Sequence, residues 1–215
     1  MTNASWWDPV RHADRRPLLL TRNRIQQKLR VWFDAQGFTE VDPAALAVSP
    51  GNEAHLHAFA TEAISLEGES ETRYLHTSPE FAMKKLLAAG ETRIHAFAHV
   101  WRNREGGPRH ASEFTMLEWY RAHEDYTVLM DDTAAFIRIA ADVAGADLLR
   151  HGKAECDPKA PYQRISVAEA FLKWAGNRPF GDDPSRRHHR PPPSGRPDGP
   201  DRHDRMARRY LGRSV

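Results

Sequence analysis

Two segments of alternating apolar residues, separated by a short polar stretch, constrain the fold of this chain more than any other feature. Residues 93–102, RIHAFAHVWR, and residues 113–121, EFTMLEWYR, each show the period of two that is typical of a β-strand. The residues between them include Gly106, Gly107 and Pro108, which favour a turn. The pattern therefore predicts a long antiparallel hairpin.

The second strand of this hairpin carries large apolar groups on both of its faces. One face holds four alternating residues, namely Phe114, Met116, Glu118 and Tyr120. The other face holds Thr115, Leu117, Trp119 and Arg121. A strand of this kind is predicted to be buried on both sides, where a carboxylate at Glu118 is costly unless a cation meets it. The cation is either a buried arginine of the chain or a ligand, and the residues alone leave both open.

An arginine, Arg102, stands at the end of the first strand, just before the polar loop. Its guanidinium group could donate two parallel hydrogen bonds to a carboxylate or a phosphate. A surface arginine beside a turn is the simpler interpretation of the same position.

Helices are predicted on both sides of the hairpin. Residues 18–36 form an amphipathic pattern that ends at Gly37, and residues 38–41 follow as a short strand. Ser78 is predicted as the N-cap of a helix that runs to Gly90, with Pro79 at its first position.

Two further helices are predicted after the hairpin. Thr127 is expected to cap a helix that ends near Gly145, and Ser166 with Glu169 forms a capping box that opens a last helix. Residues 44–72 are hard to interpret, with short strands expected around the turn at Pro50 and Gly51.

The composition changes after Gly176. Residues 177–215 hold 10 Arg, 5 Asp and 7 Pro, with no Lys or Glu, and we predict that they are disordered. They are either a genuine basic tail or, as we favour, the product of a frameshift or truncation. Residues 1–176 are predicted to form one domain with a net charge of −3, which argues against a general nucleic-acid-binding protein.

The remaining composition predicts a soluble, cytoplasmic protein. The chain has one cysteine, Cys156, and no apolar run long enough for a signal peptide or a membrane helix. His55 and His57 are spaced for a metal on a strand, but no Cys or carboxylate cluster at ligand spacing accompanies them. We therefore predict no metal site in the protein itself.

Three segments, in this order, resemble motifs of class II aminoacyl-tRNA synthetases. GFTEVDP (37–43) is similar to motif 1, and TSPEFAMKKLLAAG (77–90) to the segment that precedes motif 2. VWRNREGGPRHASEFTMLEWYR (100–121) resembles motif 2 in its lysine-specific form, especially that of the lysyl-tRNA synthetase-like ligases that modify elongation factor P. The resemblance covers about residues 16–176. It implies an α+β fold, an antiparallel sheet flanked by helices, and a homodimer formed through motif 1.

The resemblance also implies a role for individual residues. Arg102 would be the catalytic residue, contacting the α-phosphate of ATP and the carboxylate of the amino acid. The ATP site would be completed by Asn103, Arg104, Glu105, His110 and Phe114. The lysine site would be formed by Ser78, Pro79, Glu80, Glu118 and Tyr120. Glu80 would face the ammonium group near the reacting carboxylate, and Glu118 and Tyr120 would face the distal one.

The implied reaction is the activation of lysine or (R)-β-lysine by ATP with Mg²⁺, followed by ligation to a lysine of elongation factor P. tRNA is not expected as the acceptor, because the predicted first helix begins near residue 18 and leaves no room for an anticodon-binding barrel. The alternatives are a truncated lysyl-tRNA synthetase and a non-catalytic, dimerising or regulatory relative.

The chain departs from the family pattern at several positions. Arg104 stands where an acidic residue is expected, followed by Glu105, and Ala111 replaces an asparagine. His110 could equally stabilise the turn, while Lys84 and Lys85 are most simply a solvated helix face. Nothing in residues 177–215 resembles motif 3. The sheet is therefore expected to be incomplete and the chain to be impaired as a ligase.

Overall fold

The computed structural model describes residues 5, 7–51 and 53–175. The chain divides into two units, residues 1–162 and 163–215. The first unit contains α1 (Pro9–Ala35), β1 (Thr39–Glu40), β2 (Leu46–Ala47), β3 (Phe59–Ile64), β4 (Ser70–Leu75), α2 (Glu80–Ala88), β5 (Arg93–Trp101), β6 (Glu113–Arg121), α3 (Thr127–Ala144), β7 (Leu149–His151) and β8 (Ala154–Cys156). The second contains α4 (Val167–Ala175). This mixture of helices and sheets confirms the α+β class. The predicted disordered segment, residues 177–215, lies outside the described residues.

The predicted hairpin forms the main sheet. Strands β5 and β6 pair antiparallel from Arg93 opposite Arg121 to Trp101 opposite Glu113. Strand β1 lies parallel to β5 on its other side, which gives the order β1-β5-β6. The hairpin prediction is thus confirmed, with β6 spanning the predicted residues 113–121 and β5 ending one residue before Arg102.

Two smaller sheets accompany the main one. Strands β2, β4 and β3 form an antiparallel sheet in that order, with β2 and β3 on either side of the predicted turn at Pro50 and Gly51. Strand β4 reaches Leu75, beyond the region in which short strands were expected. Strands β7 and β8 form a two-stranded hairpin that was not predicted.

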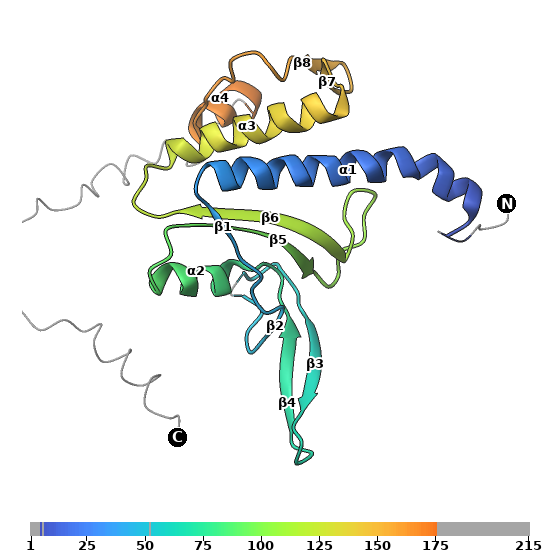
Figure 1. The fold of residues 1–215 in the computed structure, drawn as a ribbon, viewed down its shortest axis with the longest axis vertical. Helices are drawn as coiled ribbons and strands as arrows, with labels where there is room; N and C mark the ends of the chain where they lie inside the picture. The colour runs from blue at the N-terminus through green and yellow to red at the C-terminus, as the bar shows by residue number, and fades with distance from the viewer. Residues whose placement is uncertain (1–4, 6, 52, 176–215) are drawn as a thin grey trace, which may run out of the picture. The chain divides into compact units, whose positions relative to one another are not determined.

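The main sheet is covered on both faces, although β6 itself is half-buried rather than buried as its sequence predicts. Helix α2 lies against one face, and α1 and α3 lie on the other (Figure 1). The cluster on the α2 side consists of Met83, Ile94, Ala96, Ala98 and Val100, with Phe114, Met116 and Tyr120 packed against it. The cluster on the α1 side consists of Leu29, Phe33, Phe38 and Phe136, with Leu117 and Trp119 packed against it. Alternate residues of β6 therefore belong to two different cores.

Helix α1 begins nine residues before its predicted start at residue 18. Its N-cap is Asp8, whose carboxylate accepts the amides of Val10 and Arg11 at 3.0 and 3.1 Å. Pro9 follows at the first position, where its missing N–H costs nothing. The predicted start was wrong because the first turns of α1 are exposed and lack apolar periodicity. A second proline, Pro17, lies inside the helix.

The predicted caps of the other helices are correct in part. Ser166 and Glu169 form the predicted capping box, with reciprocal hydrogen bonds of 2.8 and 3.2 Å to each other's backbone amides. Gly145 ends α3 with a φ of 66°, as expected for a C-terminal glycine. The N-cap of α3 is Tyr126 rather than Thr127, because the carboxylate of Asp125 already accepts the Thr127 amide. No helix in the described ranges is long and apolar enough to cross a membrane.

The N-cap of α2 differs from the prediction in the other direction and lies one residue later. It is Pro79 rather than Ser78, although the Ser78 hydroxyl still accepts the amide of Glu80 at 3.0 Å. The hydroxyl therefore satisfies a helix amide as a capping residue would, from one position earlier.

A buried histidine, His95, lies within the α1-side core. The residue is 2% exposed, and its ring stacks on Phe33 with a centroid distance of 4.0 Å. Among the described residues neither ring nitrogen has a hydrogen-bond partner, although Nε2 lies 3.6 Å from a carboxylate oxygen of Glu40. Burial lowers the pKa of His95, and the Glu40 carboxylate opposes this effect only in part.

The position of His95 predicts a loss of stability in acid. The unfolded chain binds this proton near the ordinary pKa of 6.5, while the folded chain binds it only at lower pH. The free energy of unfolding should therefore fall as the pH decreases below about 6.5. His95→Leu should flatten this dependence in urea titrations at a series of pH values, whereas His12→Leu, which removes an exposed histidine, should retain it. An unchanged slope in His95→Leu would contradict the prediction.

Candidate functional site

The loop between β5 and β6 is held at its base by backbone hydrogen bonds. The amide of Arg102 donates to the carbonyl of Ser112 at 2.8 Å, and the amide of Asn103 donates to the carbonyl of His57 at 2.6 Å. The Ser112 hydroxyl donates to the Glu105 carbonyl at 2.9 Å. Arg104 adopts a positive φ of 63°, a conformation that most residues avoid. The loop thus leaves the sheet in a defined direction.

A hollow of about 390 Å³ lies beside this loop. It is lined by six residues, namely Arg102, Glu105, Arg109, His110, Ala111 and Phe114. Four of the six residues predicted to bind ATP are therefore brought together here. Asn103 and Arg104 do not line the hollow, and Arg109 was not predicted.

The hollow combines two guanidinium groups with an aromatic ring. The Arg102 guanidinium carbon lies 5.4 Å from the centroid of the Phe114 ring, within the range of a cation–π contact. Arginines suit phosphate oxygens, and an aromatic ring suits the face of a base. The amide of His110 donates to Gly107 at 3.2 Å, which agrees with the turn-stabilising alternative for this residue.

An acid–phenol pair lies on the same strand as Phe114. The carboxylate of Glu118 accepts hydrogen bonds from the Tyr120 hydroxyl at 2.5 Å and from the Ser78 hydroxyl at 2.8 Å. Burial raises the pKa of Tyr120 well above its ordinary value, and the hydrogen bond to Glu118 adds to the effect. Tyr120 is therefore a donor to Glu118 throughout the physiological pH range.

Glu118 has hydroxyl partners but no cationic one. In the described part of the chain it forms no ion pair, so the buried arginine that the sequence left open is not its partner. Two hydroxyl donors offset part of the cost of desolvating this half-buried carboxylate, but neither carries a charge that pairs with it. This arrangement suits a cationic ligand.

The start of α2 adds a second carboxylate. Glu80 is half-buried, and its carboxylate pairs with Lys84 at 2.5 Å. Pro79, which was predicted in the lysine site, has a fully buried side chain and is not available to a ligand. The remaining predicted lysine-site residues, Ser78, Glu80, Glu118 and Tyr120, lie together.

Thr77 connects the hollow beside the loop to the acid–phenol pair. The Arg102 side chain donates to the Thr77 carbonyl at 3.2 Å, and the next residue, Ser78, contacts Glu118. Arg102 also contacts Phe114, which shares the α2 side of the sheet with Tyr120. Arg102 and the acid–phenol pair thus lie on the same face of the sheet, and the residues just before α2 contact both of them.

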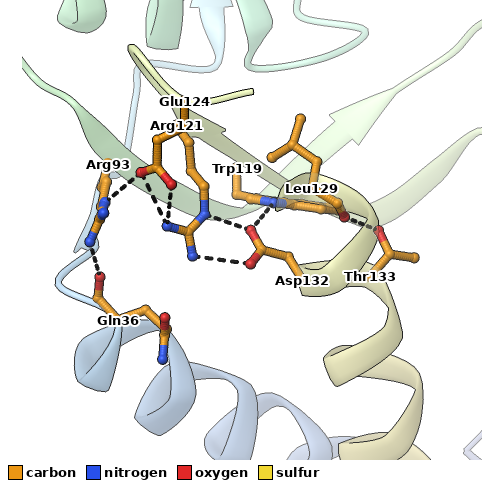
Figure 2. A network of polar contacts seen from close by, with 8 residues as sticks. All are labelled: Gln36, Arg93, Trp119, Arg121, Glu124, Leu129, Asp132 and Thr133. Atoms are coloured by element: carbon orange, nitrogen blue, oxygen red, sulfur yellow. Dashed lines mark hydrogen bonds and ion pairs between the residues drawn. The ribbon is translucent and has the colours of Figure 1, made fainter. Parts of the chain in front are cut away.

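A buried polar network lies on the opposite face, at the far end of β6 (Figure 2). Arg121 donates two hydrogen bonds to Asp132 of α3, at 2.8 and 3.0 Å, and the Trp119 ring nitrogen donates to the same carboxylate at 3.1 Å. Arg121 also pairs with Glu124, which accepts from Arg93 at 2.9 Å. The sequence did not predict this network, because its central pair, Arg121 and Asp132, joins a strand to a helix 11 residues later.

Comparison with known proteins gives two kinds of match. Residues 3–210 match the model of the family described as tRNA synthetases class II (D, K and N), a range that includes residues in which we found no third motif. A lysine–tRNA ligase of Pasteurella multocida is 33% identical over 172 residues, covering 80% of this chain and 34% of that protein. An elongation factor P–(R)-β-lysine ligase of Actinobacillus succinogenes is 37% identical over 146 residues, covering 67% of this chain and 44% of that protein. The chain thus spans about a third of the length of the tRNA ligases that it matches.

Proposed function

Because the chain belongs to the class II tRNA synthetases of the D, K and N group, we propose that its β5–β6 hairpin forms a lysine-adenylating site. The observation that carries the proposal is Glu118, an ionisable carboxylate with two hydroxyl donors and no cation in the described residues. The distal ammonium group of lysine or (R)-β-lysine would supply the missing charge. Both kinds of relative named above are lysine or β-lysine ligases.

The proposed amino acid lies between Glu118 and Arg102. Glu118 and Tyr120 hold the distal ammonium group, and Glu80 holds the ammonium group near the carboxylate. Arg102, which stands beside Thr77 and Phe114, meets the carboxylate and the α-phosphate. This arrangement uses the same side of the sheet for both ends of the substrate.

The proposed nucleotide occupies the hollow beside the loop. Phe114 offers a ring to the adenine, while Arg102, Glu105 and His110 surround the phosphates. The lysine carboxylate oxygen forms a bond to the α-phosphorus as the bond to pyrophosphate breaks, so negative charge grows next to Arg102. Mg²⁺ bound to ATP would offset the charge of the leaving pyrophosphate. Asn103 and Arg104 would contribute through the shape of the turn.

The proposed acceptor is a lysine side chain of elongation factor P, in a homodimeric ligase. Its amine would attack the carbonyl carbon of the adenylate, and AMP would leave. The support is the 37% identity to an elongation factor P–(R)-β-lysine ligase together with the lysine-type strand EFTMLEWYR. The match to lysine–tRNA ligases covers more of the chain, 80%, and favours tRNA as the second candidate acceptor.

Lysine binding to the full chain tests the proposed site. Glu118→Gln should weaken lysine binding about ten- to a hundredfold in titration calorimetry, since a hydrogen bond to a charged group contributes about 1.5–3 kcal/mol. Glu113→Gln, which alters an exposed carboxylate of the same strand, is the matched control and should bind as the parent does. Equal affinities of the parent and Glu118→Gln would refute the proposal.

A further inference from the structure

One cation of the chain lies directly at the acidic end of the proposed site. Lys84 is four residues after Glu80 on α2, and its ammonium group contacts a Glu80 carboxylate oxygen at 2.5 Å. Glu80 lies close to Glu118, because the Ser78 hydroxyl bonds both the Glu80 amide and the Glu118 carboxylate. Two carboxylates and one internal ammonium group therefore share this end of the site.

The charges of Glu80, Glu118 and Lys84 influence the titration of neighbouring groups at this end of the site. The pKa of Lys84 is raised by its hydrogen bond to Glu80 and, more weakly, by the charge of Glu118. The charge of Glu80 in turn contributes to the raised pKa of Tyr120. Lys84 is thus within the field of both carboxylates, although it contacts only one of them.

We propose that Lys84 is a tethered competitor for Glu80, and that its ammonium group must release this carboxylate when the amino acid binds. The inference rests on the proposed function, because it assigns Glu80 to the ammonium group nearest the reacting carboxylate. In the empty site Lys84 stands in for that group. Lys84 therefore sets the affinity of the site without contacting the bound substrate.

The ion pair between Lys84 and Glu80 is weak enough for the ammonium group of a ligand to replace Lys84. The side chain of Lys84 is 55% exposed, and exposed ion pairs on helices add little stability. Glu118, in contrast, is bonded to two hydroxyl groups and has no internal cation among the described residues. The two ends of the site thus differ: one carboxylate is open to a ligand, and the other is already paired.

A comparison of two ligands and two variants tests this role in the full 215-residue chain. Lysine carries both ammonium groups, while 6-aminohexanoate has the distal ammonium and the carboxylate but no ammonium group beside it. Lys84→Met should bind lysine about two- to fivefold more tightly than the parent, as removal of an exposed ion pair allows. It should bind 6-aminohexanoate with the affinity of the parent. The gain for lysine should shrink as the ionic strength is raised.

Lys85→Met is the matched control. Lys85 is the next residue of α2, is also exposed, and forms no ion pair within the described ranges, so its loss should leave both affinities unchanged. Lysine affinity of Lys84→Met equal to or weaker than the parent's would overturn the inference, as would an equal gain for 6-aminohexanoate. If lysine binding still depends on Glu118 in those cases, the proposed function is retained and only the role of Lys84 is rejected. If no variant shows Glu118-dependent binding, both fail.

Discussion

Arg121→Met is expected to destabilise the protein by about 3–5 kcal/mol, because it leaves the carboxylate of Asp132 buried without its cation. The two side chains are 6% and 4% exposed, and Arg121 donates two of the hydrogen bonds that Asp132 accepts. The Trp119 ring nitrogen would remain as a donor, but a neutral donor does not balance a buried charge. Urea unfolding followed by tryptophan fluorescence would measure the change.

Removal of both charges should be milder than removal of one. In the double variant Arg121→Met, Asp132→Leu no uncompensated charge is buried, so the loss should be smaller than in Arg121→Met. Glu155→Gln breaks an ion pair whose side chains are 68% and 52% exposed and should cost less than about 1 kcal/mol. A loss of similar size in Glu155→Gln and Arg121→Met would show that burial of the pair is not the cause.

Phe33→Ala should also destabilise the protein by about 3–5 kcal/mol, since it removes a large side chain from a packed core. Phe33 is fully buried and contacts the rings of Trp32, Phe38, His95 and Phe136 with centroid distances of 5.3, 5.0, 4.0 and 5.0 Å. These partners come from α1, α3, β5 and the segment before β1, so a cavity at Phe33 would weaken a contact that several elements share. Thermal unfolding monitored by circular dichroism would measure the loss.

Leu66→Ala provides the comparison for Phe33→Ala. Leu66 is fully exposed at the β3–β4 turn, so its truncation removes no buried contact and should change stability by less than about 0.5 kcal/mol. A small effect in Phe33→Ala, comparable to that of Leu66→Ala, would mean that the α1-side core can collapse around the cavity.

The hairpin could be predicted because its signal is local. The alternation over residues 93–102 and 113–121 reports directly on which side chains face which side of a strand, and the register follows from the loop between them. The same alternation placed Glu118 and Tyr120 on one face and Trp119 and Arg121 on the other, as the two cores confirm.

Features that depend on distant partners or on weak local patterns were missed. The start of α1 is set by a single capping carboxylate at Asp8, in a segment with no buried face. Strands β7 and β8 are wholly exposed and joined by a turn at Gly152, so apolar alternation does not mark them. The Arg121–Asp132 pair joins a strand to a later helix, and neither residue indicates its partner by spacing.

The site was predicted through family resemblance rather than through pattern. Periodicity alone left the partner of Glu118 open between an arginine of the chain and a ligand. The structure shows two hydroxyl partners instead, one from the same strand and one from the start of α2. The pairing of Lys84 with Glu80 could have been suspected from their spacing of four on a helix, but not its closeness to Glu118.

The residues proposed to hold both substrates fall within one uninterrupted stretch, from Thr77 to Tyr120, which comprises α2 and the β5–β6 hairpin. Ser78 links the two parts, since its hydroxyl joins the first turn of the helix to the middle of β6. Every proposed ligand contact can therefore be altered by substitutions within this one stretch, while the other face of β6 must still complete the α1-side core.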